Sequence, residues 1–205
     1  MTKNIIFDIG NVIAYIDYNE TLDKIIDNLE DRKFILDNVL NAPEWTIEHT
    51  IDIGYYDLDD FISIIGDRTN NTKDDLIKYY MHEHYKFLIV NTKVLELIKE
   101  LKEKNYKVYI LSNLNKEAHE IYEKAGVFDL VDGYVLSYKE HKVKPYQGIY
   151  KTLINRYNLL PEESIFIDDN LDNCETAKTL GIDYINVNKN DYNDLENKLK
   201  ERGIV

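Results

Sequence analysis

Residues 5–13 of the chain read IIFDIGNVI, an apolar run that Asp8 and Gly10 interrupt. A short, continuous apolar run that ends in this way is typical of a buried β-strand, so we predict a strand over residues 4–9. The same pattern recurs three times later in the chain, and residues 134–137 are a further candidate. The further strands that it predicts are 107–112 (KVYILS), 134–137 (YVLS), 164–169 (SIFIDD) and 183–188 (DYINVN).

Helical patterns separate these strands. Apolar residues within 94–101 follow the i, i+3, i+4, i+7 spacing of an amphipathic helix. Further helices are predicted over residues 115–125, 146–157 and 172–180. Gly126 and Gly181 follow two of them, at the position where a helix C-cap is expected. Strands that alternate with helices predict an α/β fold, a Rossmann-like parallel sheet covered by helices on both faces.

Residues 16–90 have a different pattern. We find amphipathic helical stretches there and no strand pattern; the helices predicted are 19–30, 32–41, 44–53, 57–66 and 72–86. We therefore expect residues 1–15 and 91–205 to form the Rossmann-like core. Residues 16–90 are predicted to form a helical cap inserted directly after the first strand.

Composition narrows the classes of partner. The chain has 205 residues and a net charge of −13, which disfavours nucleic acids and anionic membranes as partners. It contains a single cysteine, Cys174, so no disulfide can form within the chain. We recognise no signal peptide and no membrane-spanning run, and we expect a cytoplasmic protein that acts on a small molecule. The oligomeric state is left open by the sequence.

Polar side chains stand where the predicted strands end. In open α/β sheets ligands bind at the carboxyl ends of the strands, and there this chain carries Asp8, Ser112 and the pair Asp168 and Asp169. Carboxylates suit Mg²⁺, while Lys144, in a loop before a helix, offers positive charge for an anionic substrate. Each residue alone has an ordinary interpretation, since an aspartate after a strand often caps a helix and a lysine is usually solvated.

The order of these residues carries more information than any one of them. Four segments in this order resemble the haloacid dehalogenase superfamily, in the branch with a helical cap after the first strand. The segments are IIFDIGNVI (5–13), ILSN (110–113), KPYQGIY (144–150) and IFIDDNLDNCETAKTLGI (165–182). Within that branch, FDIGNVI, IDYN (16–19) and DDNLDN (168–173) are most similar to bacterial phosphatases of the sugar-1-phosphate type.

The resemblance implies a magnesium-dependent phosphatase that acts on a small phosphorylated metabolite, such as a sugar phosphate. Asp8 would attack phosphorus and form an aspartyl-phosphate, as a nucleophile in covalent catalysis. Mg²⁺ would be held by Asp8, the backbone carbonyl of Gly10 and Asp169, with Asp168 close by.

The resemblance also implies how the phosphate is held. The Ser112 hydroxyl and the Asn113 backbone N–H would bind phosphoryl oxygens. Lys144 would balance the negative charge of Asp8 and of the phosphate.

The chain departs from the family pattern at Gly10. Phosphatases of this superfamily usually carry a second aspartate there, which protonates the leaving group, and such help is typically worth ~10²–10⁴-fold in rate. Three explanations remain open. The substrate could have a good leaving group, such as an anomeric sugar oxygen; Asp17 or a cap residue such as His49 could replace the acid; or the chain binds phosphates with little turnover. We favour the first.

The cap residues and the reaction class each allow more than one interpretation. Trp45, His49, Tyr55 and Tyr56 could line a substrate pocket, although packing between helices is the more ordinary explanation of such aromatic residues. His82 and His84 are expected to be solvated. A dehalogenase that uses the same nucleophile, and a phospho-acceptor signalling domain, are further possibilities. The late acidic pair disfavours the first, and the helical insert disfavours the second.

Overall fold

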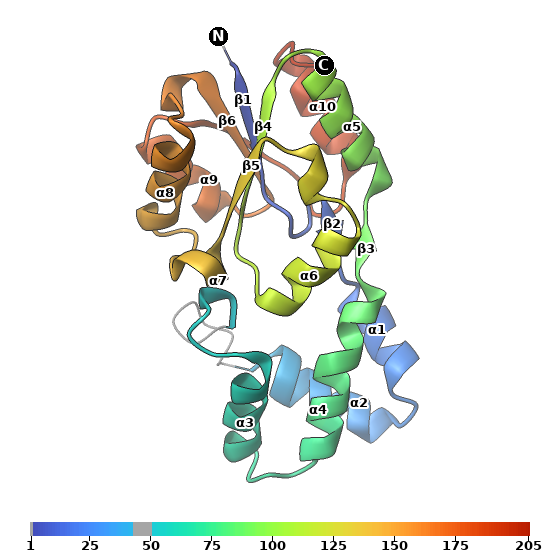
Figure 1. The fold of residues 1–205 in the computed structure, drawn as a ribbon. Coiled ribbons are helices and arrows are strands. Elements are labelled where there is room, and N and C mark those ends of the chain that lie inside the picture. Colours follow the sequence, from blue (N-terminus) through green and yellow to red (C-terminus); the bar gives the residue numbers. More distant parts are fainter. Residues whose placement is uncertain (1, 43–50) are drawn as a thin grey trace.

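The computed structural model describes residues 2–42 and 51–205 (Figure 1). In this part of the chain, five parallel strands form one sheet in the order β5-β4-β1-β6-β7. The strands are β1 (Asn4–Phe7), β4 (Lys107–Ser112), β5 (Gly133–Leu136), β6 (Ser164–Asp168) and β7 (Asp183–Asn186). The predicted α/β fold is confirmed. The chain passes from β1 to one side of the sheet and later returns to the other, so β1 lies at the centre.

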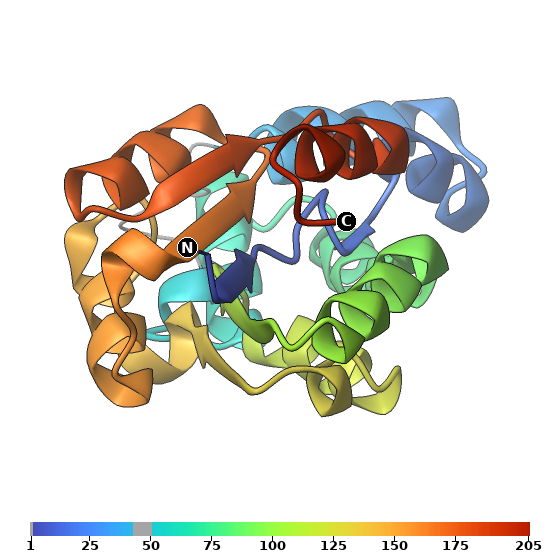
Figure 2. The same ribbon diagram turned by 90° about the horizontal axis from the view of Figure 1, so that it is seen from above.

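Helices cover both faces of the sheet (Figure 2). Successive residues of a strand point to opposite faces, and Ile5 and Phe7 of β1 pack in one apolar cluster while Ile6 packs in another. The first cluster includes residues of α5 (Thr92–Glu103), α6 (Lys116–Lys124) and α10 (Tyr192–Glu201). The second includes residues of α8 (Gln147–Tyr157) and α9 (Leu171–Thr179).

The remaining helices lie below the carboxyl edge of the sheet in Figure 1. They are α1 (Tyr18–Ile25), α2 (Leu29–Ile35), the π-helix Leu36–Leu40, α3 (Leu58–Arg68) and α4 (Asp74–Glu83). Short turns of 3₁₀ helix occur at Ile51–Ile53, His84–Phe87, Phe128–Leu130 and Pro161–Glu163, and the short helix α7 spans Ser137–Glu140. This helical end joins the sheet part through two antiparallel strands, β2 (Ala14–Tyr15) and β3 (Ile89–Val90).

Several predicted elements are confirmed in position. All five predicted strands are present within a few residues, and the helices of 115–125, 146–157 and 172–180 correspond to α6, α8 and α9. Gly126 and Gly181 follow α6 and α9 with φ of 75° and 86°, the left-handed region that glycine adopts at a helix C-cap.

Other predictions were wrong in part. A strand, β3, does occur within 16–90. The sequence did not reveal it because two residues are too few to show a period. The helix predicted over 19–30 is two helices, since Asn28 caps α2 by accepting bonds from the N–H groups of Glu30 and Asp31. Helix α10 was not predicted. The prediction over 44–53 lies mostly outside the described residues, and its end, Ile51–Ile53, is a 3₁₀ turn.

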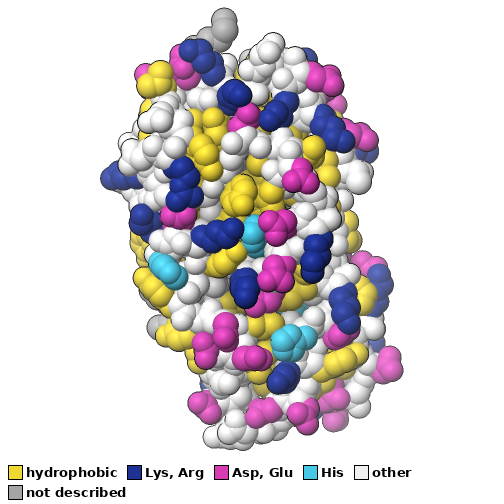
Figure 3. Space-filling model, viewed as in Figure 1, with side chains coloured by type: hydrophobic (Ala, Val, Ile, Leu, Met, Phe, Trp, Pro, Cys, Tyr) yellow, Lys and Arg dark blue, Asp and Glu magenta, His cyan; other side chains and the backbone are white. Residues whose placement is uncertain are grey.

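The acidic composition of the chain is visible on its surface. Figure 3 shows many acidic side chains over the helical end on this face, whereas lysines and acids alternate over the sheet part. No helix in the described ranges combines the length and the apolar character that crossing a bilayer requires.

Candidate active site

The carboxylates predicted at the strand ends meet at one edge of the sheet. Asp8 follows β1 and Asp168 ends β6, and the pairing of Phe7 with Ile167 places these strand ends side by side. One carboxylate oxygen from each of Asp8, Asp168 and Asp169 lies within 4.8 Å of the other two. Carboxylates so close together repel one another unless positive charge lies among them. The cluster is therefore a candidate cation site.

Lys144 supplies one positive charge from within the protein. Its side chain is 2% exposed, and its Nζ lies 2.9 Å from Oδ1 of Asp8 and 2.6 Å from Oδ2 of Asp168. Asn113 holds the loop that carries Lys144: its Oδ1 accepts a bond from the Lys144 N–H at 2.8 Å, and its Nδ2 donates to the Lys144 carbonyl at 3.0 Å. The lysine is thus fixed between two carboxylates.

Asp168 is surrounded by donors. Its Oδ1 accepts bonds from the N–H of Asn170 at 2.8 Å and from Nδ2 of Asn173 at 3.1 Å. Its Oδ2 accepts from Asn173 at 3.0 Å and from Lys144 at 2.6 Å. Because both oxygens already accept hydrogen bonds, Asp168 is suited to positioning Lys144 rather than to donating several electron pairs to a metal.

Asp169 is held less tightly. It is half-buried, and its Oδ2 accepts a bond from Nδ2 of Asn11 at 3.1 Å. Burial raises the pKa of Asp169 above its usual value, and the charge on Asp168 raises it further. This carboxylate lies beside Asp8 with room to bind an ion.

Electrostatics favour a further cation at the cluster. Burial raises the pKa of Asp8 from 3.8 to about 7; Lys144 opposes that effect and the charge of Asp168 adds to it. Burial lowers the pKa of Lys144, but Asp168 and Asp8 outweigh burial and hold that pKa above its usual value. Three carboxylates and one ammonium leave an excess of negative charge. Their oxygen donors match the preference of Mg²⁺, so the residues present fit that ion.

Ser112 and Gly10 lie next to Asp8. Ser112 ends β4, the neighbour of β1; it is buried, and its hydroxyl lies close enough to Asp8 to lower the pKa of that carboxyl. A Cβ atom on Gly10 would lie 4.0 Å from Oδ2 of Asp8, so Gly10 leaves open space directly beside the carboxylate.

A cavity of about 200 Å³ extends from Gly10 into the interface with the helical end. Gly10 and Asn11 line it from the loop after β1, and Asn113 and Asn115 line it from the segment after β4. The helical end contributes Tyr18, Asp52, His84 and Tyr85, and α6 contributes Tyr122. A cavity bounded by both parts of the molecule is a candidate site for the part of a substrate that leaves.

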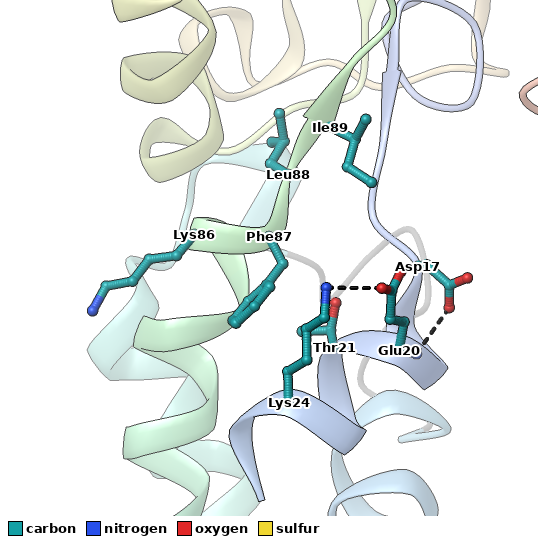
Figure 4. Close-up of a pocket in the computed structure, with 8 residues that line it drawn as sticks. All are labelled: Asp17, Glu20, Thr21, Lys24, Lys86, Phe87, Leu88 and Ile89. Atoms are coloured by element: carbon teal, nitrogen blue, oxygen red, sulfur yellow. Dashed lines mark hydrogen bonds and ion pairs between the residues drawn. The ribbon is translucent and has the colours of Figure 1, made fainter.

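Asp17 lies elsewhere. It is exposed and caps α1, accepting a bond from the Glu20 N–H at 3.0 Å. It lines a separate cavity of about 160 Å³ where α1 meets the segment before β3, and Figure 4 shows its carboxylate near the ion pair between Lys24 and Glu20, 2.8 Å. A capping role accounts for Asp17.

The predicted aromatic cluster is divided. Trp45 and His49 lie outside the described residues. Tyr55 is 63% exposed and stacks on His141, with ring centroids 5.0 Å apart, outside the cavity beside Gly10. The expectation that His84 is solvated was wrong: it is buried, and its Nδ1 lies 3.3 Å from the carbonyl of Tyr80.

Comparisons with known proteins show the family of the chain. The family profile of haloacid dehalogenase-like hydrolases matches residues 2–181. The chain belongs to this family. Among curated relatives, this family member is 28% identical over 197 residues to a D-ribitol-5-phosphate phosphatase of Bacteroides thetaiotaomicron, covering 89% of this chain and 90% of that protein. It is 25% identical over 181 residues to a sesquiterpene phosphatase of Aspergillus oryzae, covering 88% and 87%.

A solved structure is also similar to this haloacid dehalogenase-like hydrolase. It is a family enzyme of Bacteroides thetaiotaomicron in complex with magnesium and inorganic phosphate, with a TM-score of 0.75 and 25% identity. The match covers 95% of this chain and 99% of that one. The fold is therefore that of a known haloacid dehalogenase family enzyme.

Sequence reasoning missed two asparagines that support the carboxylates. Asn11 bonds to Asp169, and Asn173 bonds to both oxygens of Asp168. Both stand within a few residues of a predicted site aspartate. A polar amide placed so close to a functional carboxylate was the signal that could have identified them.

Proposed function

We propose that this haloacid dehalogenase-like hydrolase is a magnesium-dependent phosphatase in which Asp8 is the nucleophile. The observation that carries the proposal is the buried Lys144 between Asp8 and Asp168, with Asp169 close enough to share a cation. A buried lysine destabilises the folded state unless its charge is paired with an opposite charge. Here it organises a nucleophile beside an anion site, and the two phosphatases among the relatives support the same reaction class.

Each residue then has a defined task. The Asp8 carboxylate attacks phosphorus, a P–O bond forms to Asp8, and the bond to the leaving oxygen breaks. Lys144 stabilises the negative charge of Asp8 and of the phosphoryl oxygens. Ser112 and the backbone N–H of Asn113 donate hydrogen bonds to those oxygens. Water then attacks phosphorus and releases Asp8.

The proposed metal site uses the nearby oxygen donors. Mg²⁺ would be held by Asp8, the backbone carbonyl of Gly10 and Asp169, with Asp168 beside it. When bound, the ion neutralises charge so that a carboxylate can approach a phosphate.

Residues 16–90 are proposed to act as the cap that selects the substrate. They cover the cavity that begins at Gly10, so the leaving part of the substrate would contact them. We propose a small phosphorylated metabolite, such as a sugar or polyol phosphate, as the substrate. This choice is supported by the hydrogen-bonding side chains in the mixed polar and apolar lining of the cavity, such as Asn11 and Asn113, and by the polyol phosphate of one relative. We place the protein in the cytoplasm, in keeping with its single cysteine.

Gly10 supports a second candidate function. Without an acid at this position, the chain could be a phosphate-binding protein with little turnover. The two functions differ in one measurable property, the release of inorganic phosphate.

The decisive experiment is a phosphate-release assay on a panel of sugar, polyol and aryl phosphates, with Mg²⁺ and with EDTA. The matched variants are Asp8→Asn and Asp172→Asn, the latter an exposed aspartate on the first turn of α9. Wild type and Asp172→Asn are expected to release phosphate only with Mg²⁺, and Asp8→Asn to release none. Phosphate binding without release from any substrate would favour the second candidate. Metal-independent halide release from 2-chloropropionate would instead indicate a dehalogenase.

A further inference from the structure

The proposed reaction lacks a proton donor at Gly10. The cavity beside Gly10 is, however, also lined by an aspartate from residues 16–90. Asp52, in the turn Ile51–Ile53, lines this cavity together with Gly10 and Asn11. Tyr122 is within electrostatic range of both acids, because the charges of Asp8 and Asp52 each raise its pKa. Asp52 therefore faces the space where the leaving group of a phosphate on Asp8 would lie.

Asp52 is anchored to the core rather than carried on a free part of the cap. Its Oδ1 accepts a bond from Nδ2 of Asn115 at 3.1 Å, and its backbone carbonyl accepts one from the Ser137 hydroxyl. The carbonyl of the next residue, Ile53, lies 3.1 Å from Nδ1 of His141.

Gly54 completes the anchor by allowing close approach to the core. A Cβ atom on Gly54 would lie 2.2 Å from the carbonyl oxygen of Tyr138. These contacts fix the turn onto α7 and the segment after β4, so the Asp52 carboxyl has a defined position over the sheet edge.

Among the described groups that line the cavity, Asp52 has the pKa best suited to donating and accepting a proton near neutral pH. Burial raises the pKa of Asp52 to about 6; Asn115 lowers it and the charge of Glu117 raises it. Among the described residues, the other titratable groups that line the cavity are tyrosines and His84. Burial raises the pKa of Tyr18, Tyr85 and Tyr122, so these phenols stay neutral. Burial lowers the pKa of His84 to about 4, so its imidazole is also neutral. A group that titrates near the working pH is the most effective acid–base catalyst.

We propose that Asp52 is the general acid and base of this phosphatase, in place of the aspartate that its relatives usually carry at position 10. This inference rests on the proposed function. In the first step the Asp8 oxygen bonds to phosphorus, the bond to the leaving oxygen breaks, and the Asp52 proton passes to that oxygen. In the second step water attacks phosphorus, its proton passes to the Asp52 carboxylate, and the bond from phosphorus to Asp8 breaks. The proton lent in the first step is thus recovered in the second.

The test compares two leaving groups in Asp52→Asn, with Asp17→Asn as the matched control. Asn keeps the shape of the side chain and its ability to accept the bond from Asn115, and Asn also caps helices well, so Asp17→Asn should behave as wild type. On D-ribitol 5-phosphate, a poor leaving group, kcat of Asp52→Asn should fall ~10²–10⁴-fold with little change in KM. On p-nitrophenyl phosphate the first step needs no acid. That variant should release a rapid burst of one equivalent of p-nitrophenolate, followed by slow turnover.

The outcomes separate the two proposals. A wild-type protein that releases no phosphate from any substrate overturns both. An active wild type whose Asp52→Asn variant keeps its kcat on the alkyl phosphate overturns the role of Asp52 alone. Equal losses on both substrates, without a burst, would mean that Asp52 only supports the structure, and would also overturn it.

A rescue variant provides a test that does not depend on loss of activity. Gly10→Asp is sterically allowed because its Cβ would meet Asp8 Oδ2 at 4.0 Å. Added to Asp52→Asn, it is expected to raise kcat on the alkyl phosphate at least ~10-fold, since a carboxyl regains access to the leaving group. A double variant no faster than Asp52→Asn would contradict an acid–base role.

Discussion

The charge of Asp8 should make the metal-free protein less stable as pH rises, and Asp8→Asn should remove this effect together with activity. Burial raises the pKa of Asp8 from 3.8 to about 7. One pKa unit corresponds to about 1.4 kcal/mol, so ionising Asp8 in the folded, metal-free chain costs about 4 kcal/mol. The folded state holds the Asp8 proton more tightly than the unfolded state does. The associated stability is therefore complete below pH 4 and is lost as pH rises through 7.

The assay is urea unfolding of wild type and Asp8→Asn in EDTA, from pH 4 to pH 8. Asn resembles the protonated carboxyl, so the two proteins should have similar free energies of unfolding at pH 4. By pH 8 the variant should be more stable than wild type by about 4 kcal/mol, the cost of ionising Asp8. Groups that do not interact with Asp8 titrate alike in both proteins and cancel in the difference.

Magnesium should narrow this difference at neutral pH. An ion bound to the ionised cluster of the folded state would stabilise wild type, by ~2.7 kcal/mol at one hundred times its dissociation constant. The variant, with one carboxylate fewer, should gain less. If the free energies of unfolding of the two proteins changed in parallel with pH, the argument that burial disfavours the ionised form of Asp8 would be refuted. Phosphate release by Asp8→Asn would refute its role as nucleophile.

Three further predictions concern individual contacts. Asp169→Ala should raise the Mg²⁺ concentration needed for half-maximal activity more than Asp168→Ala does, because the Asp168 oxygens already accept several hydrogen bonds; the reverse order in a Mg²⁺ titration would exchange their roles. Asp168→Ala should instead lower the urea midpoint, since removing one partner of a buried ion pair typically costs ~3–5 kcal/mol; an unchanged midpoint would contradict this. Gly54→Ala should lower both kcat and the melting temperature, because its Cβ would lie 2.2 Å from the Tyr138 carbonyl at a φ of 79°; full activity and stability would show that the turn can shift freely.

The sequence was sufficient for the sheet and for the identity of the four site segments. Buried parallel strands read as continuous apolar runs, and the residue that ends each run lies at the carboxyl edge, so Asp8, Ser112 and Asp168 could be placed together before any coordinates were known. The two-residue strands β2 and β3 and the break at Asn28 escaped prediction, because periodicity needs more residues than these features contain.

What the sequence by itself determined is the set of polar groups at the sheet edge: an aspartate after the first strand, a later acidic pair, a hydroxyl and a lysine, in a fixed order along parallel strands. Only the tertiary structure decided that Lys144 is buried between two carboxylates, that Asp17 lines a different cavity, and that Asp52 lines the same cavity as Gly10. The physical reason is that a strand's ends follow from local pattern. The approach of a cap residue to the core instead depends on contacts between distant segments, such as Asp52 with Asn115, that no local pattern encodes.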